Sequence, residues 1–120
     1  MKKSNYHRGH LAEKIALLWL ILKGYKLVQM NYVTGRGTGA SEIDLIMKKS
    51  HTLVFIEVKE RQNLTTAGEA ITHQAQQRIA RAAEAFLSKN PAYRDYNVRF
   101  DAILFNTGYM PHHIKDAWRL

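Results

Sequence analysis

The feature that most constrains the fold is a pair of neighbouring apolar segments, each of which carries one carboxylate. The first runs from Ser41 to Ile46 and the second from Val54 to Lys59. Both are rich in aliphatic and aromatic residues, a pattern that is typical of β-strands. The residues between them, 48–52, are polar enough to form a turn. The sequence therefore predicts an antiparallel hairpin.

The register of this hairpin decides which side chains meet. With the turn centred on Ser50 and His51, Asp44 lies opposite Glu57. Side chains that lie directly opposite share one face of a sheet, with Cβ atoms about 5 Å apart. Lys59 follows Glu57 by two positions and therefore points the same way. The pairing predicts two carboxylates and one amine together on one face.

Such an arrangement of like charges requires compensation. Carboxylates opposite each other destabilise a sheet, and burying them unpaired costs free energy or shifts their pKa. A Mg²⁺ ion held by Asp44 and Glu57 removes the conflict and leaves positions for phosphate oxygens. Lys59 can then stabilise developing charge or orient a water. The alternative is that both acids are exposed near strand ends and that Lys59 forms a surface ion pair. The spacing leaves both interpretations open.

Length and charge limit the remaining possibilities. The chain has 120 residues, so residues 1–120 are expected to form a single domain. It carries 18 Lys and Arg against 10 Asp and Glu, a net charge of +8, which suggests nucleic acid or an anionic membrane surface as partner. Because it has no Cys, disulfides and cysteine zinc sites are excluded, and a cytoplasmic location is expected. The apolar run 15–22 is too short to span a bilayer.

The first helix is expected to end at Lys23, with Gly24 in the position that tolerates a positive φ. Its predicted core face is an apolar stripe at helical spacing, widened by small and aromatic residues, and we expect it to be covered on most sides. The stripe consists of Leu11, Ile15, Leu18 and Leu22, widened by Ala12, Ala16 and Trp19. Glu13 lies beside the stripe. It is either an exposed acid near the helix start, which the residues alone favour, or a third carboxylate of the metal site.

The other expected elements follow from similar patterns. Strands are expected at 25–33 and 97–105, a helix from Ile71 to Asn90, and a short edge strand from His112 to Trp118. The core face of that helix is expected to contain Ala75, Ile79, Ala82, Ala83, Phe86 and Leu87. The six histidines form no convincing set of metal ligands, and all are expected at the surface.

Several arginines are candidates for contacts with phosphate. Arg36 lies in a glycine-rich loop next to Asp44, and Arg61 lies in a polar loop after Lys59. Arg78 and Arg81 lie on the polar side of the helix 71–90. A solvated helix face is the simplest interpretation of these two, and phosphate contact is the alternative.

The order of elements, with acids and a lysine on the central hairpin, resembles the restriction-endonuclease-like core of the PD-(D/E)xK superfamily. Within it, the chain is similar to the YraN-type family of predicted endonucleases. The residues that carry this resemblance extend from about His10 to Trp118. They are Glu13, Gly24-Tyr25, Asn31, Gly39, Glu42 to Ile46, Val54 to Lys59, Ile71-Thr72, Gln76, Arg99 to Asp101 and His113 to Trp118.

The resemblance implies an α/β fold with a mixed β-sheet flanked by helices in the order αβββαβ. It implies that Asp44, Glu57 and the carbonyl of Val58 bind Mg²⁺ or Mn²⁺. It further implies that Lys59 helps to activate water, while Glu13 and Gln76 flank the site.

The chain departs from the family pattern at two positions. Ile43 stands where the superfamily has Pro, and Ala75 stands where relatives often have Lys, which removes a possible phosphate contact. The expected function is metal-dependent hydrolysis of phosphodiester bonds in DNA, including branched or damaged DNA. The alternative is a non-catalytic nucleic-acid-binding module on a degenerate nuclease fold. The oligomeric state is left open, with a homodimer as one option.

Overall fold

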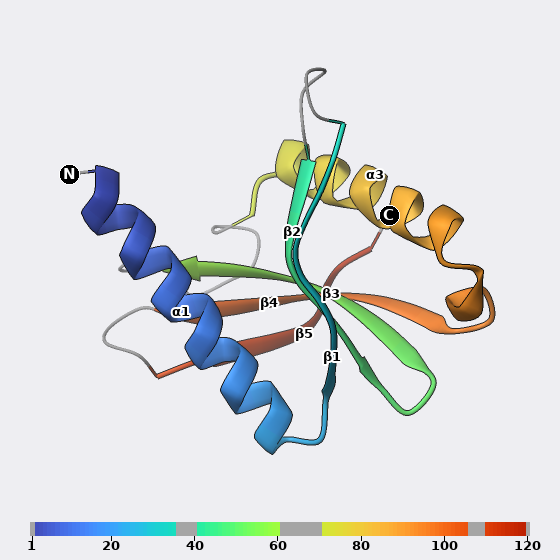
Figure 1. The fold of residues 1–120 in the computed structure, drawn as a ribbon, viewed down its shortest axis with the longest axis horizontal. Coiled ribbons are helices and arrows are strands. Elements are labelled where there is room, and N and C mark those ends of the chain that lie inside the picture. Colours follow the sequence, from blue (N-terminus) through green and yellow to red (C-terminus); the bar gives the residue numbers. More distant parts are fainter. Residues whose placement is uncertain (1, 36–40, 61–70, 106–109, 120) are drawn as a thin grey trace.

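The computed structural model describes residues 2–35, 41–60, 71–105 and 110–119, with the side chains of the first helix described from Leu11 onward. Its centre is a five-stranded sheet with the strand order β1-β2-β3-β4-β5 (Figure 1). The strands are β1 (Lys26–Thr34), β2 (Ser41–Lys49), β3 (Thr52–Glu60), β4 (Asn97–Phe105) and β5 (His112–Trp118). The helices are α1 (Lys2–Leu22), α3 (His73–Lys89) and the short 3-10 helix η1 (Pro91–Tyr93).

The sheet is mixed because one pair of neighbouring strands is parallel. β1, β2 and β3 form an antiparallel meander, β4 runs parallel to β3, and β5 pairs antiparallel with β4 at the edge. Parallel neighbours need a crossover connection, and α3 lies in the segment between β3 and β4. The hairpin pairs Lys49 with Thr52 and Leu45 with Ile56, which confirms the predicted register over that span.

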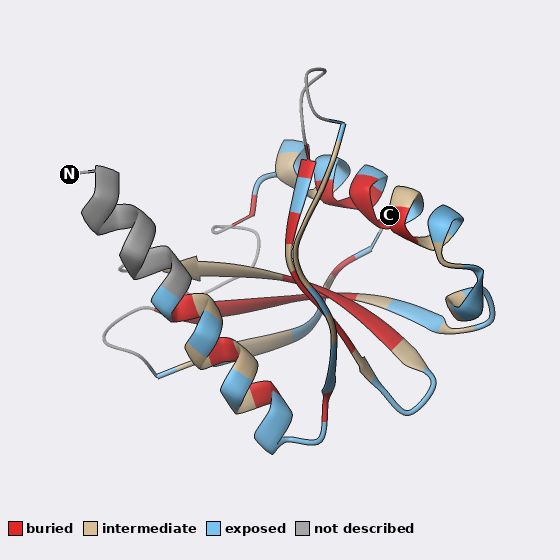
Figure 2. Ribbon diagram, in the orientation of Figure 1, coloured by how far each residue is buried: buried red, intermediate tan, exposed pale blue. Residues whose placement is uncertain are grey.

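The two long helices cover opposite faces of the sheet. Alternate residues of β3 separate the two cores: Leu53 and Phe55 pack in the α3 cluster, whereas Val54 and Ile56 pack in the α1 cluster. Figure 2 shows the buried residues concentrated along the central strands and on the inward sides of the helices. The predicted α/β class with a mixed sheet flanked by helices is confirmed, and this arrangement is consistent with a restriction-endonuclease-like fold.

The second long helix begins and packs as the sequence predicts. Thr72 caps α3, and its Oγ1 accepts a hydrogen bond of 3.1 Å from the amide of Ala75. Its buried positions repeat at helical spacing and confirm the predicted core face. They are Ile79, Ala80, Ala82, Ala83 and Phe86. The predicted strand at 97–105 and the predicted edge strand at 112–118 are also confirmed.

The predicted core face of α1 is only partly right. Ala12 and Ala16 are buried together with Leu20, and Ile15 and Trp19 pack against this cluster, whereas Leu11, Leu18 and Leu22 are exposed. The helix is apolar on nearly every side, so hydrophobicity does not select one face. Small alanine side chains allow close approach to the sheet, which favours the side that carries them. The helix is consequently not covered on most sides.

The turn after α1 follows the expected pattern. Gly24 has a φ of 96°, a backbone angle that residues with a Cβ rarely adopt. Its amide donates to the carbonyl of Ile21 at 3.0 Å, closing the last turn of the helix. Among the residues that the structure describes, no helix is long and apolar enough to span a membrane.

Candidate functional site

The candidate site lies where β2 and β3 separate. Their paired residues end at Leu45 and Ile56, and the strands then diverge, as Figure 1 shows near the centre of the sheet. Asp44 lies at this fork. Its Oδ2 accepts a hydrogen bond of 2.9 Å from the amide of Val58, which would bond to a β2 carbonyl in a continued ladder. The fork therefore holds the Asp44 carboxylate between the two strands.

Glu57 is the second carboxylate at the fork. Its side chain is only 14% exposed. Burial is the main reason that the pKa of Glu57 rises to about 9, and the charge of Asp44 and a hydrogen bond with that residue raise it further. The predicted proximity of Asp44 and Glu57 is therefore present in the structure. Neither acid is an isolated, solvated residue.

Lys59 is the cation nearest to this pair among the described contacts. Its Nζ lies 3.6 Å from Oε2 of Glu57, and its positive charge counteracts part of the rise in the pKa of Glu57. Because Lys59 and Glu57 are two positions apart on β3, their side chains project on the same side. The structure brings Asp44, Glu57 and Lys59 together.

Glu13 reaches the same group from helix α1. Burial raises the pKa of Glu13 to about 8, and the charges of Asp44 and Glu42 and a hydrogen bond with Asp44 act in the same direction. Its Oε1 is buried and has no hydrogen-bond partner within the described part of the chain. The interpretation of Glu13 as an exposed acid is therefore wrong. Glu13 lies with the other carboxylates, as the alternative interpretation expected.

Asn31 is a neighbour of the site to which the sequence analysis gave no role. It hydrogen-bonds with Glu13, and this contact lowers the pKa of that acid against the stronger effects that raise it. Its φ of 51° lies in the left-handed region, which Asn tolerates better than most residues. In β1 it occupies the position between Met30 and Tyr32, whose partners Leu45 and Ile43 flank Asp44. The signal for Asn31 in the sequence was a polar residue within a largely apolar strand.

The carboxylates at the fork are donors of the kind that a divalent cation requires. Mg²⁺ and Mn²⁺ prefer carboxylate ligands, and the unpartnered oxygen of Glu13 and the raised pKa of Glu57 both indicate that ionisation of these acids lacks a compensating positive charge. Glu13 and Glu57 each interact with Asp44. Within the described residues, however, no group of three or more His, Cys, Asp or Glu is positioned to hold a metal ion. The chemistry of the donors fits a cation that is held by two carboxylates.

The other predicted site residues are more dispersed. Gln76 is half-buried, and its Nε2 donates a hydrogen bond of 3.1 Å to the carbonyl of Ile71, at the start of α3. Arg78 and Arg81 are exposed on α3. Arg36 and Arg61 lie outside the described residues. The amide of Val58 donates to Asp44, whereas metal binding by the Val58 carbonyl stays a prediction.

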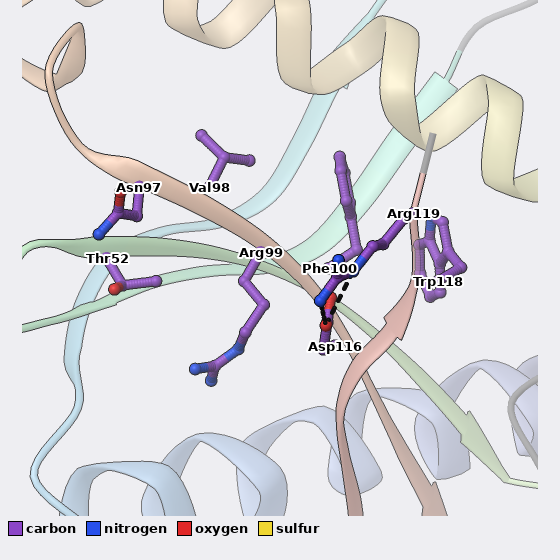
Figure 3. Close-up of a pocket in the computed structure, with 8 residues that line it drawn as sticks. All are labelled: Thr52, Asn97, Val98, Arg99, Phe100, Asp116, Trp118 and Arg119. Carbon is purple, nitrogen blue, oxygen red and sulfur yellow. Dashed lines mark hydrogen bonds and ion pairs between the residues drawn. The ribbon is translucent and has the colours of Figure 1, made fainter.

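A pocket of about 510 Å³ lies at a different place, between β4 and β5 (Figure 3). Asp116 and Arg119 form an ion pair of 2.6 Å at its side. The pocket is lined by Thr52, Asn97, Val98, Arg99, Phe100, Asp116, Trp118 and Arg119. Glu13, Asp44 and Glu57 are not among these residues. The pocket is therefore separate from the fork.

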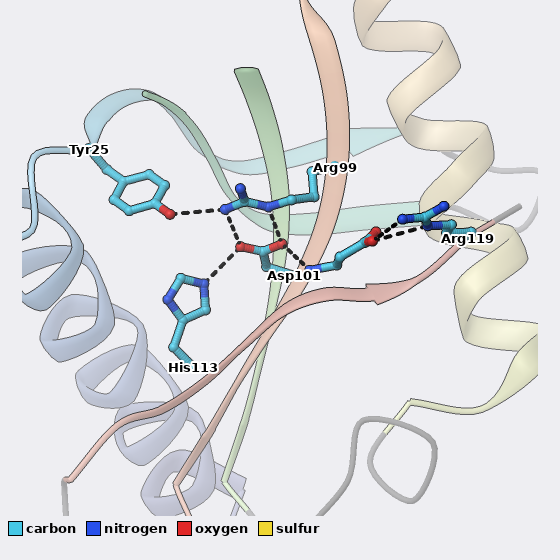
Figure 4. A network of polar contacts seen from close by, with 6 residues as sticks. Tyr25, Arg99, Asp101, His113 and Arg119 are labelled. Atoms are coloured by element: carbon cyan, nitrogen blue, oxygen red, sulfur yellow. Dashed lines mark hydrogen bonds and ion pairs between the residues drawn. The ribbon is translucent and has the colours of Figure 1, made fainter. Parts of the chain in front are cut away.

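A second polar cluster is centred on Asp101, which is fully buried (Figure 4). Arg99 donates from Nε and a terminal nitrogen to its two oxygens, both at 2.8 Å. His113 donates to Oδ2 at 2.7 Å, and the amide of Asp116 donates to Oδ1 at 2.9 Å. Burial acts to raise the pKa of Asp101, but the bonds from His113, Arg99 and Asp116 lower it below its usual value.

This cluster corrects the expectation that all histidines lie at the surface. The side chain of His113 is 3% exposed and packs edge-on against Trp19 and Tyr25. Arg99 also donates to the hydroxyl of Tyr25 at 2.9 Å, so the cluster connects β4 and β5 to the end of α1. The alternation of β5 places His112 and His113 on opposite sides, and the sequence alone did not show which side was buried.

Comparison with known proteins identifies relatives over nearly the whole chain. The model of the uncharacterised protein family UPF0102 matches residues 12–105. A UPF0102 protein of Paramagnetospirillum magneticum is 45% identical over 113 residues, covering 94% of this chain and 88% of the relative. UPF0102 proteins of Nitrobacter winogradskyi and Rhodopseudomonas palustris are 36% and 39% identical, and cover 98% and 94% of this chain. The alignments include 97% and 81% of those two relatives.

Proposed function

The chain belongs to the uncharacterised protein family UPF0102, and we propose that it is a metal-dependent nuclease that hydrolyses phosphodiester bonds in DNA. The observation that carries this proposal is the acidic fork. Asp44, Glu57 and Glu13 converge there from β2, β3 and α1, and the pKa values of the last two are raised. A folded protein rarely keeps such acids together unless they serve a function. The resemblance to the PD-(D/E)xK nucleases gives that function a chemical class.

Asp44 and Glu57 would hold a Mg²⁺ or Mn²⁺ ion, together with the carbonyl of Val58. When bound, the cation supplies positive charge that stabilises the phosphoryl transition state and acidifies a water molecule. The hydrogen bond from the Val58 amide fixes the orientation of the Asp44 carboxylate. This bond supports Asp44 as one of the proposed ligands, because it holds the carboxylate between the two strands.

Lys59 has the position of a residue that acts on the attacking water. Its side chain is 30% exposed and remains near Glu57, so it is accessible to solvent while its charge is held at the fork. From there the ammonium group would orient the water or stabilise negative charge that develops on phosphate. Glu13 would flank the site, and its buried Oε1 has no hydrogen-bond partner among the described residues. Gln76 would flank the site from the start of α3.

The charge of +8 supports DNA as the partner, because phosphates are bound by Lys and Arg without regard to sequence. Arg78 and Arg81 would contribute from the exposed side of α3, and Arg36 and Arg61 from the segments next to β2 and β3. Branched or damaged DNA is the substrate that we favour.

The decisive experiment measures cleavage by highly purified protein in Mg²⁺, Mn²⁺ or EDTA. The substrates are a linear duplex, a nicked duplex and a four-way junction of matched sequence. We expect metal-dependent cleavage that is lost in Asp44→Asn, with Asp95→Asn as an exposed acid control purified in the same way. Equal residual cleavage by the wild type and Asp44→Asn would identify a contaminating nuclease and contradict the proposal.

One observation favours a second candidate function, a non-catalytic module that binds nucleic acid. Within the described residues the acids do not form a three-ligand metal group. This candidate predicts DNA binding without cleavage in any metal. The same assay therefore separates the two functions.

A further inference from the structure

The C-terminal end of α1 exposes large aliphatic side chains that the core does not use. Leu18, Ile21 and Leu22 are 63%, 47% and 85% exposed, and Leu27 at the start of β1 is 42% exposed. The same part of the helix buries Leu20 completely against the sheet. The exposed leucines therefore project outward from a helix whose inner side is already packed. Such a concentration of exposed apolar side chains indicates an interaction surface.

Two lysines lie beside these aliphatic residues. Lys23 follows Leu22 directly and is exposed. Lys49 closes the group, because its Nζ donates a hydrogen bond of 2.9 Å to the carbonyl of Lys23. We refer to this surface as the basic apolar end. It comprises Leu18, Ile21, Leu22, Lys23, Leu27 and Lys49.

The positive charge of the basic apolar end is not compensated by nearby acids. The sequence contains no Asp or Glu between Glu13 and Glu42, and none between Asp44 and Glu57. Within the described residues, none of the surface's lysines forms an ion pair. Lys23 instead lies 4.1 Å from the ring centroid of Trp19. These ammonium groups are therefore held beside apolar groups and are available to an external anion.

We propose that the basic apolar end binds the surface of an anionic lipid bilayer. The four aliphatic side chains would enter the boundary between headgroups and acyl chains, and the lysines would meet the anionic headgroups. Both features are those of proteins that lie on a membrane without crossing it. No described helix is able to span a bilayer, which agrees with attachment at the surface.

Other partners match this surface less well. Nucleic acid would bind the lysines, but its phosphates gain nothing from an exposed leucine such as Leu22. A second copy of the chain, related by a twofold axis through this surface, would place lysines against lysines. The bilayer is the partner that satisfies the aliphatic groups and the positive charges together.

The basic apolar end is remote from the acidic fork. Asp44 lies near the start of β2, whereas Lys49 is its last residue, next to the tight turn to β3. Strand geometry separates these positions by roughly 3.3 Å for each residue. A chain attached through the basic apolar end would leave the fork accessible. The inference does not depend on the proposed nuclease activity, and its test requires none.

The test is co-sedimentation of the full chain with vesicles of phosphatidylcholine alone or with one third phosphatidylglycerol. We expect binding to the anionic vesicles only. The double variant Ile21→Ser/Leu22→Ser should weaken it at least about tenfold, since two exposed aliphatic side chains no longer enter the bilayer. Lys23→Gln and Lys49→Gln should each weaken it about fivefold. Met110→Ser and Lys115→Gln, which change exposed residues elsewhere, are the matched controls and should bind as the wild type does.

A second measurement reports insertion directly. The chain has no Cys, so Leu22→Cys provides a single site for an environment-sensitive fluorophore, with Met110→Cys as the control. We expect a blue shift on anionic vesicles at position 22 only. Failure to bind anionic vesicles would overturn the proposal. Binding that ignores Ile21→Ser/Leu22→Ser, or a shift equal at both labelled positions, would also overturn it, because that is non-specific adsorption of a basic protein.

Discussion

The carboxylate of Asp44 accepts the amide hydrogen of Val58 at 2.9 Å, at the point where β2 and β3 separate. A side chain thus takes the place that a backbone carbonyl of β2 would occupy in a continued ladder. The bond satisfies an otherwise unpaired amide and holds the carboxylate beside Glu57. Asp44 is therefore both a structural acceptor and the centre of the acidic fork, and substitutions there have effects on stability and on chemistry that have to be measured separately.

Replacing Asp44 by Asn is expected to abolish cleavage and to leave DNA binding unchanged or slightly tighter. The rate should fall by at least about 10²- to 10³-fold, because a charged ligand is lost. In EDTA above about pH 9, where Glu13 and Glu57 are ionised, the variant should be as stable as the wild type or more stable, since the charge that repels them is removed while the amide oxygen can still accept from Val58. Thermal melts should also show a smaller stabilisation by Mn²⁺. A large loss of stability in EDTA with an unchanged Mn²⁺ response would make Asp44 purely structural.

The stability of the metal-free protein should decrease as the pH rises from about 4.5 to about 9. Glu13 and Glu57 have raised pKa values in the folded protein, near 8 and 9. Over this range the folded state keeps protons that the unfolded chain has released, so the free energy of unfolding falls by at most about 1.4 kcal/mol per pH unit for each retained proton.

Glu57→Gln should flatten this decrease, because the amide cannot ionise. Urea unfolding in EDTA at several pH values measures the slopes, with the exposed Glu84→Gln as control. Mn²⁺ should stabilise the wild type more at higher pH, since metal binding requires deprotonated carboxylates. Equal slopes for wild type and Glu57→Gln would show that Glu57 titrates normally.

Lys59→Met is expected to slow cleavage by about 10²- to 10³-fold while metal binding persists. The loss of the ammonium group 3.6 Å from Glu57 should raise the pKa of Glu57 further, because Lys59 counteracts that rise. The pH range in which Mn²⁺ stabilises the protein should consequently shift to higher values. A titration of thermal stability against pH at fixed Mn²⁺ checks this shift, and Lys115→Met, on β5, is the control. An unaltered pH profile would separate Lys59 from the acidic fork.

Asp101→Asn should destabilise the fold by roughly 3–5 kcal/mol, because a buried charged group would lose its partner and several donors would compete for one oxygen. The lowered pKa of Asp101 means that its stabilising effect is present above the unfolded value of 3.8 and is lost as the pH falls below it. The difference between variant and wild type should therefore shrink in acid. Chemical denaturation at pH 7 and pH 3 provides the comparison, with the exposed Asp95→Asn unaffected. A cost below about 1 kcal/mol at pH 7 would show that the cluster is dispensable.

The affinity for duplex DNA should fall linearly with salt concentration on logarithmic axes. If Arg78 and Arg81 each contact one phosphate, replacing either by Gln should reduce the slope by about 0.9. Fluorescence anisotropy between low and moderate salt measures these slopes, with Lys115→Gln as the control. A slope that does not change in either variant would place the DNA on another face of the molecule.

The hairpin and its register were predictable because the pattern of apolar residues and the position of the turn leave few alternatives. Leu45 faces Ile56 as the parity of the two strands requires. The fork was not predictable, since it depends on where the ladder stops, and no local pattern encodes that point. The position of Glu13 depends on how α1 crosses the sheet, and its neighbours in sequence contain no information about this.

The errors in α1 and at His113 have a common physical origin. The second half of α1, residues 15–22, is apolar on all sides and gives no preferred direction to a hydrophobicity argument, and the close packing of Ala12 and Ala16 decides which side faces the sheet. Likewise, the order of polar and apolar residues in β5 does not mark one face as buried, and His113 is held by Asp101 on the neighbouring strand. Both outcomes were set by contacts between distant parts of the chain.

The confinement of the fork to α1, β2 and β3 has a consequence for the order of folding. Its acids all lie between Glu13 and Glu57, and the hairpin that joins two of them closes through short-range contacts. The parallel pairing of β3 with β4 closes a much longer loop, and such long-range pairings slow folding. The repulsion among the acids therefore arises early along the route to the native state. Acidification or Mn²⁺ should accelerate refolding, whereas changes at Asp101 should mainly accelerate unfolding.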